Sequence, residues 1–118
     1  MIRALAIFLA LTAGAGATQQ SVSEAPIAVL RGLDKVNGHT QDITISIGEV
    51  ASFGPFEIKL TSCRYPLGNP SGDAFAHVTI TENGKPPVFS GWMVASAPAL
   101  SAMDHPRYDV WVMRCATS

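Results

Sequence analysis

The chain has 118 residues, of which 47% are apolar and 14% charged, and its formal net charge is −1. This length accommodates one domain, and the apolar fraction with the small net charge excludes a disordered acidic or basic tail. The eight Lys and Arg residues stand singly along the chain against nine Asp and Glu residues. Without a basic footprint, no nucleic-acid partner is expected.

The first 17 residues have the order of a secretory signal peptide. A positive charge at Arg3 precedes the apolar run ALAIFLAL, and a small-residue stretch ends at Ala17. This order predicts cleavage between Ala17 and Thr18, with cleavage after Ala15 as the alternative. A transmembrane anchor needs about 20 apolar residues, which this segment does not reach. We therefore expect an exported, periplasmic protein with no transmembrane anchor after cleavage.

Cys63 and Cys115 are the two cysteines of the sequence. An even number of cysteines in an exported chain predicts a disulfide, because the compartment is oxidising. Metal ligation and a functional thiol are the alternatives, although there is no C-x-x-C motif or Cys-rich cluster to complete a tetrahedral site. The expected Cys63–Cys115 bond would join the middle of the chain to its end.

Residues 18–26 are polar and aperiodic, and we expect them to form a flexible mature N-terminus before a single β-rich domain, residues 27–118. The Asn83-Gly84 pair within this domain is a strong hairpin signal. Segments with apolar–polar alternation or β-branched side chains predict strands over residues 27–33, 43–47, 56–61, 74–82, 88–94 and 108–115. The pattern predicts an all-β small sandwich or barrel of about six or seven strands.

One segment before the last predicted strand has a helical pattern instead. Ser96 is a candidate N-cap, and His105-Pro106 ends the pattern. Leu100 and Met103 are its sizeable side chains, and we expect both to point at the core beside Trp92. The fold class is thus all-β with one short helix, or a 3₁₀ turn, before the last strand.

The sequence carries no recognisable catalytic motif. His39, His77 and His105 are isolated from one another, and G-x-S-x-G, H-E-x-x-H and phosphate-binding glycine patterns are absent. Asp104 and Ser101 lie close to His105 in the sequence, but a catalytic triad is defined by geometry rather than by proximity along the chain. We expect no catalytic residue, no metal and no cofactor, with a hydrolase as the least favoured alternative.

Aromatic side chains gather in the last third of the chain. Trp111 lies between two valines and is expected in the core. Trp92 and Met93 precede a small-residue turn, and packing under the short helix is the favoured interpretation. An apolar surface for a partner, or a pocket that also involves Tyr108, is the alternative.

Three stretches carry a family resemblance: residues 28–35 (AVLRGLDK), residues 53–58 (FGPFEI), and residues 89–106, which continue through 108–112 (YDVWV) to Cys115. With them the chain resembles the DUF2155 family of short exported proteins, found mainly in alphaproteobacteria. The resemblance implies export to the envelope and no established enzymatic activity. It also suggests a link to the respiratory chain, because genes of this family often lie beside one for an accessory subunit of complex I.

Together these features predict a non-catalytic periplasmic domain that binds or braces a protein partner in the cell envelope. Its sharpest version is a periplasmic-side accessory subunit of an inner-membrane complex, respiratory complex I. The alternative is a small-ligand or cell-wall binding module with a pocket near Trp92 and Tyr108. A flat apolar patch would favour the first function, and a pocket with convergent polar groups the second.

The expected export can be tested at the N-terminus. We predict that protein recovered from the native envelope begins at Thr18, or at Gly16 if the earlier site is cut, because signal peptidase removes the leader. Mass spectrometry of the intact protein and of its N-terminal peptide measures the start directly. An intact Met1 on envelope protein would contradict the prediction.

Overall fold

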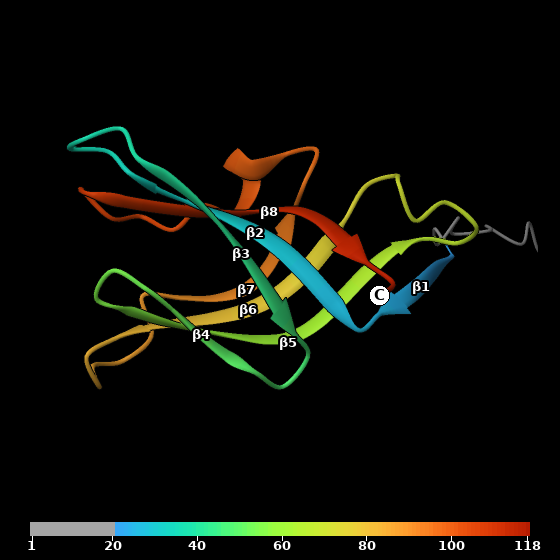
Figure 1. Ribbon diagram of the computed structural model, residues 1–118, viewed down its shortest axis with the longest axis horizontal. Coiled ribbons are helices and arrows are strands. Elements are labelled where there is room, and N and C mark those ends of the chain that lie inside the picture. The colour runs from blue at the N-terminus through green and yellow to red at the C-terminus, as the bar shows by residue number, and fades with distance from the viewer. Residues whose placement is uncertain (1–20) are drawn as a thin grey trace, which may run out of the picture.

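The computed structural model describes residues 21–118, which form two antiparallel sheets that pack face to face (Figure 1). The expected signal peptide and its cleavage site lie outside the described residues. The larger sheet has the order β1-β5-β6-β7, with β4 also paired to β5, and the smaller sheet has the order β3-β2-β8. The elements are β1 (Val22–Ala25), β2 (Ile27–Asp34), β3 (Thr40–Ser46), β4 (Val50–Phe53), β5 (Phe56–Pro66), β6 (Phe75–Glu82), β7 (Phe89–Val94), the 3₁₀ helix η1 (Pro98–Ser101) and β8 (Tyr108–Ala116).

The all-β expectation is confirmed, including the short 3₁₀ turn before the last strand. Residues 21–118 form eight strands rather than six or seven, because the sequence pattern predicted neither β1 nor β4. β1 corrects part of the expectation of a flexible segment, since Val22–Ala25 pair with β5 and Ala25 lies in the core opposite Cys63; residues 18–20 lie outside the described residues. Across residues 21–118 there is no helix with the length and hydropathy that crossing a membrane would require.

A β-bulge in β5 decides which face of the sheet Cys63 reaches. Inward positions run from Phe56 in steps of two to Leu60, so strict alternation would bury Ser62 in the core and turn Cys63 outward. The pairing with β6 shifts between Leu60 and Ser62, which makes Thr61 the extra residue. A one-residue shift exchanges the two faces of a strand. Cys63 therefore lies between the sheets.

β8 contains a second bulge with the same effect. Val110 and Val112 point inward, and strict alternation would place Arg114 inside and Cys115 outside. The register against β2 skips Met113, so this residue is the extra one. Cys115 is consequently 5% exposed and faces the core, whereas Arg114 is exposed.

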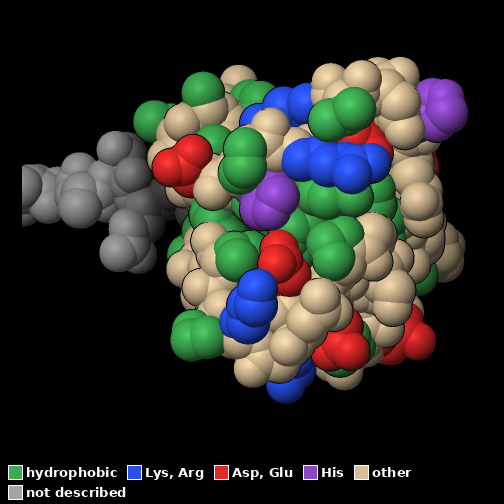
Figure 2. Space-filling view, turned by 90° about the vertical axis from the view of Figure 1, so that its left-hand side faces the viewer, with side chains coloured by type: hydrophobic (Ala, Val, Ile, Leu, Met, Phe, Trp, Pro, Cys, Tyr) green, Lys and Arg blue, Asp and Glu red, His purple; other side chains and the backbone are tan. Residues whose placement is uncertain are grey.

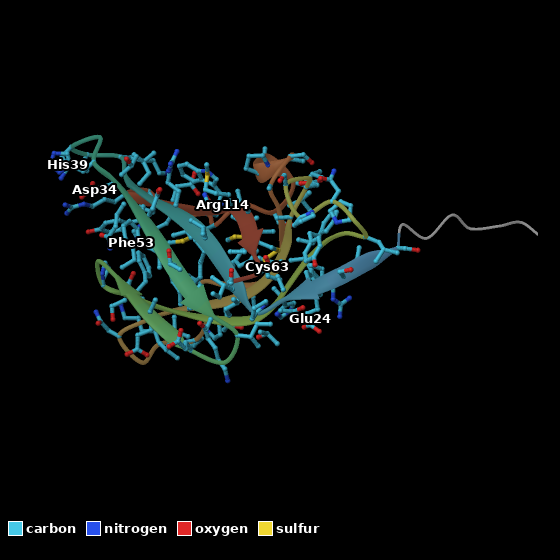
Figure 3. The ribbon with its side chains drawn as sticks, turned by 45° about the vertical axis from the view of Figure 1, so that its right-hand side comes forward. Glu24, Asp34, His39, Phe53, Cys63 and Arg114 are labelled. Carbon is cyan, nitrogen blue, oxygen red and sulfur yellow. A yellow bond between two sulfur atoms is a disulfide. The ribbon has the colours of Figure 1, made fainter. Side chains whose placement is uncertain are left out.

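The two bulges allow the expected disulfide to form between the sheets. Cys63 and Cys115 are bonded, with their Cα atoms 5.8 Å apart, and no free cysteine remains. The bond joins β5 of the larger sheet to β8 of the smaller one. It therefore crosses the core as a covalent tie (Figure 3).

The segment between β7 and β8 differs from the expectation in two respects. Leu100 is 76% exposed and does not pack in the core, whereas Met103 is 3% exposed and does. Ser96 does not cap the helix, because the N-cap position is Ala97 and has no side-chain hydrogen bond. Ser96 instead donates from its N–H and its Oγ to Asp73, at 2.9 and 2.6 Å, and so fixes the segment to the loop before β6.

Removing the disulfide should lower stability strongly, because the chain between the cysteines is long. We predict that Cys63→Ala/Cys115→Ala loses on the order of 4 kcal/mol of unfolding free energy, as the chain-entropy model gives for a loop of this length. Urea unfolding measures the loss, and wild-type protein unfolded with a reductant serves as the matched control. Equal stability of the oxidised and reduced wild type would contradict the prediction.

A second prediction concerns Gly32, where β2 has no side chain. A Cβ there would lie 2.5 Å from Cζ of Phe53, which reaches across from β4 of the other sheet and is 6% exposed. Gly32→Ala should therefore destabilise the protein by about 1–3 kcal/mol through overpacking. In Gly32→Ala/Phe53→Leu the loss should be smaller than the sum of the two single losses, because the shorter side chain relieves the clash. Strictly additive losses would show that the two positions do not compete for space.

Candidate functional site

The outer face of the larger sheet carries a polar and aromatic cluster that we call the Trp92 patch: Glu24, Ser62, Arg64, His77 and Trp92. The strand register brings these residues together. His77 on β6 lies opposite Trp92 on β7 and opposite Ser62 on β5, and Arg64 on β5 lies opposite Glu24 on β1. The β5 bulge is the reason that Ser62 and Arg64 share this outer face.

Trp92 lies on the edge strand β7, at one end of the patch, and is held in a defined position. Its side chain is 39% exposed, the guanidinium carbon of Arg64 lies 5.0 Å from its ring centroid, and the His77 ring meets it edge-on at 5.2 Å. Such cation–π and edge-to-face contacts hold an exposed indole in place. Nδ1 of His77 is buried and has no hydrogen-bond partner among residues 21–118. The imidazole is therefore positioned by packing.

Glu24 and Ser62 complete the charged side of the patch. The Oγ of Ser62 donates to Oε1 of Glu24 at 3.1 Å across the β1–β5 pair. The cluster thus offers an acidic group, a basic group and an aromatic ring in neighbouring positions on one face. Trp and Arg are also the residue types that most often dominate protein–protein binding energies.

This arrangement corrects the expectation for Trp92. Met93 occupies the inward position on β7 with 1% exposure, and alternation along the strand turns Trp92 outward rather than under the short helix. Met93 is therefore a core residue and not part of a partner surface. Trp111 was also expected in the core, but it lies between inward-facing Val110 and Val112 and is only partly buried.

Tyr108 does not share a pocket with Trp92. It packs between the sheets at the end of the sandwich where β8 begins, with its ring edge-on to Phe53 at 5.7 Å and to Phe56 at 5.3 Å. The Arg107 guanidinium covers the ring at 5.1 Å and pairs with Asp34 at 2.9 Å. The Arg107–Asp34 ion pair therefore links the start of β8 to β2, and its guanidinium covers the aromatic cluster.

His105 fixes the segment that leads into β8. Its Nδ1 accepts hydrogen bonds from the N–H groups of Arg107 and Tyr108 at 3.0 and 3.2 Å, and its Nε2 lies 3.4 Å from Oε1 of Glu82. The imidazole is thus engaged with backbone and carboxylate partners. The described residues show no hydrogen bond between this imidazole and Asp104 or Ser101, its neighbours in the sequence.

A pocket of about 510 Å³, which we call the end pocket, opens at the Tyr108 end of the sandwich. Figure 2 views this end and shows apolar side chains at its centre, framed by acidic, basic and histidine side chains. Figure 3 shows Asp34, His39 and Phe53 together at this end and Glu24 at the other. The lining residues are Asp34, Asn37, His39, Thr40, Gln41, Phe53, Gly54 and Tyr108.

The electrostatics of this end centre on Asp34. Hydrogen bonds from the Arg107 guanidinium hold the pKa of its carboxyl below the usual range, against the opposing effect of partial desolvation. The backbone N–H of Val36 also donates to Oδ1 of Asp34, at 3.0 Å. Asp34 therefore stays ionised, and its carboxylate is occupied by the Arg107 guanidinium and the Val36 N–H. Within residues 21–118, no group of three His, Cys, Asp or Glu side chains is placed to hold a metal ion.

Comparisons with known proteins give a family but no activity. A family model described as an uncharacterized protein conserved in bacteria, DUF2155, matches residues 28–115. The chain is also similar to an uncharacterized protein of Rickettsia prowazekii (strain Madrid E), with 33% identity over 87 residues, 70% of this chain and 56% of that protein. The chain thus spans little more than half the length of this relative. No solved structure matches.

The lowered pKa of Asp34 predicts an acid-dependent loss of stability. A carboxyl whose pKa is lower in the folded than in the unfolded chain contributes stability above the usual aspartate pKa, about 3.9, and loses it as the pH falls through the lowered value. We expect Asp34→Asn to lower the melting temperature at pH 7, and the difference from wild type to shrink once the pH falls below that usual value. Asp104→Asn is the control, because its exposed carboxyl has no hydrogen bond to the described residues. A difference that stays constant with pH would contradict the assignment.

Proposed function

The chain belongs to the DUF2155 family of uncharacterized bacterial proteins, and from its geometry we propose a non-catalytic domain of the cell envelope that binds a protein partner through the Trp92 patch. The observation that carries this proposal is the half-exposed Trp92 beside Arg64. Because Arg64 and His77 already hold the indole in place, little conformational freedom would be lost when a partner binds, which favours affinity.

The use of the ionisable side chains supports a binding role. Asp34 is held by Arg107, Asp73 accepts two hydrogen bonds from Ser96, and the His105 imidazole accepts backbone N–H groups. Each of these groups ties one chain segment to another. A general acid or base, in contrast, needs a proton-transferring atom that faces a substrate.

The proposed location in the envelope rests on the leader sequence and on the disulfide. A buried bond between the sheets is compatible with an oxidising compartment, where such bonds persist. The respiratory complex as partner follows from the family resemblance alone. This complex is the more specific version of the proposed partner, and the identity of the co-purifying proteins tests it.

We predict that Trp92→Ala abolishes partner co-purification while stability changes by less than about 1 kcal/mol, because the side chain lies outside the core. Tagged protein is isolated from native membranes, the co-eluting proteins are quantified by mass spectrometry, and thermal unfolding is measured in parallel. Arg64→Ala should weaken co-purification as well, since it removes the guanidinium that positions the indole.

Leu100→Ala is the matched control, because Leu100 is a large apolar side chain with 76% exposure outside the patch. It should leave both co-purification and stability unchanged. The proposal fails if Trp92→Ala retains its partners, or if its loss of partners follows a loss of folding. Subunits of respiratory complex I among the proteins lost with Trp92→Ala would support the sharper form, and a different set of proteins would contradict it.

A further inference from the structure

The edge strand β7 leaves main-chain hydrogen-bonding groups unpaired. β7 ends the larger sheet beside β6, and just beyond it the N–H of Ala95 donates to the C=O of Ala74 at 2.9 Å. The bonded residues of an antiparallel ladder alternate along each strand, so counting back from Ala95 the bonds to β6 skip Trp92 and Ser90. The N–H and C=O groups of these two residues therefore point away from β6. They have no hydrogen-bond partner among residues 21–118, and both residues are exposed.

The other sheet edges are better protected against pairing with another chain. On the β3 edge, Oε1 of Glu49 accepts the N–H of Ser46 at 2.8 Å, and on the β8 edge, Oδ1 of Asp109 accepts the N–H of Val110 at 2.9 Å. The remaining edge is shared by β1 and β4, which have four residues each. Charged side chains and short strands are common ways to protect an edge. β7 has six residues, none of them charged, and is the least protected of the described edge strands.

Arg64 gives the β7 edge a preference for negative charge. Its guanidinium carbon lies 5.0 Å from the centroid of the Trp92 ring, and the guanidinium forms no ion pair among residues 21–118. A strand added to β7 would run beside Trp92 and place alternate side chains on the outer face. A carboxylate at such a position can pair with the guanidinium. The β7 of a second copy has no acidic side chain, so self-pairing would not supply this carboxylate.

We propose that the partner protein adds an extended segment to the open edge of β7, with an acidic side chain on the outer face beside Trp92 and Arg64. This inference rests on the proposed function and specifies how the same patch is bound. The added segment exchanges main-chain hydrogen bonds with Ser90 and Trp92, and its outward side chains pack against the indole. In strand addition the main-chain hydrogen bonds supply affinity, and alternate side chains supply specificity.

A proline at position 90 tests the main-chain contacts. Ser90→Pro removes one open donor and places a ring where the added strand would pair. Proline is accepted on edge strands where the N–H faces solvent, so the fold should persist. We expect co-purification from native membranes to fall by about tenfold, as the loss of one hydrogen bond can cause. Ser90→Ala keeps the N–H and should weaken co-purification less.

Thr44→Pro is the matched control on another edge. Thr44 is exposed on β3, and the N–H of Ile47 donates to the C=O of Pro26 at 2.9 Å, so alternation turns the Thr44 N–H away from β2. The same substitution is thus made at an outward N–H that lies outside the Trp92 patch. It should leave co-purification unchanged. Thermal unfolding of both proline variants is measured in parallel.

Hydrogen exchange of the wild type tests the proposal without any substitution, and it decides the question if Ser90→Pro fails to fold. The probe is the complex that co-elutes with the tagged protein, compared with the protein alone. We expect the amides of Ser90 and Trp92 to exchange rapidly in the protein alone and to become protected in the complex. Overlapping synthetic peptides from the sequence of the co-eluting protein then serve as competitors. The peptide that displaces this protein should contain Asp or Glu.

The outcomes separate this inference from the proposed function. Retention of the partner by Trp92→Ala would reject the proposed function itself. If Trp92→Ala loses the partner but folded Ser90→Pro keeps it, or if Ser90 and Trp92 gain no protection in the complex, strand addition is rejected and the proposed function stands. A displacing peptide without an acidic residue would also reject the proposal. So would a wild type that is dimeric by light scattering and monomeric as Ser90→Pro, because a second copy would then occupy the edge.

Discussion

The Cys63–Cys115 disulfide joins the two sheets through their side chains, and its formation depends on a β-bulge in each of the strands that carry it. If β5 alternated regularly through Thr61 instead of forming a bulge there, the first cysteine would point away from the core. The same would hold for the second cysteine if β8 alternated regularly through Met113. Both bulges are needed for the two sulfur atoms to meet.

The β5 bulge also shapes the outer surface. The register shift that turns Cys63 inward places Ser62 and Arg64 on the outer face, beside His77 and Trp92. The guanidinium over the indole is therefore a consequence of the same irregularity that allows the disulfide. The disulfide and the arrangement of the proposed partner surface therefore both depend on the β-bulge at Thr61.

The opposite end of the sandwich is closed without a covalent bond. Gly32 admits the Phe53 ring, this ring packs on Tyr108, and the Asp34–Arg107 pair lies over the tyrosine. These contacts join both sheets but leave the two neighbouring turns apart, and the end pocket lies there. The disulfide thus holds the sheets together covalently at one end. Non-covalent contacts around Tyr108 hold them together at the other end, which is more open to solvent.

The sequence predicted the features that follow from alternation over several residues. Six strands and the Asn83-Gly84 hairpin were found, and this pair adopts the positive φ angles that such turns require. β1 and β4 escaped because four-residue strands that bury little side-chain surface leave almost no periodic signal. A β-bulge also leaves no periodic signal in the sequence. The side of the sheet that each cysteine faces could therefore not be predicted.

The candidate site was predicted less well, for a related reason. The sequence analysis assigned Trp92 to packing. Trp92 and Met93 are neighbours in an alternating strand, so they face opposite sides of the sheet, and because Met93 is buried, Trp92 faces outward. The pairing of Arg64 with Trp92 depends on a cross-strand register that no local pattern contains. The end pocket brings together residues from β2, β3, β4 and β8, and sequence spacing alone does not show that these meet.

Hydrogen exchange of the oxidised and the reduced protein tests most directly whether the disulfide closes one end of the sandwich while non-covalent packing closes the other. The account predicts that reduction lowers backbone protection mainly in β1, in the second half of β5 and at the end of β8. The segments around Asp34, Phe53 and Tyr108 should keep most of their protection. Loss of protection first around Tyr108, or an equal loss in every strand, would contradict it.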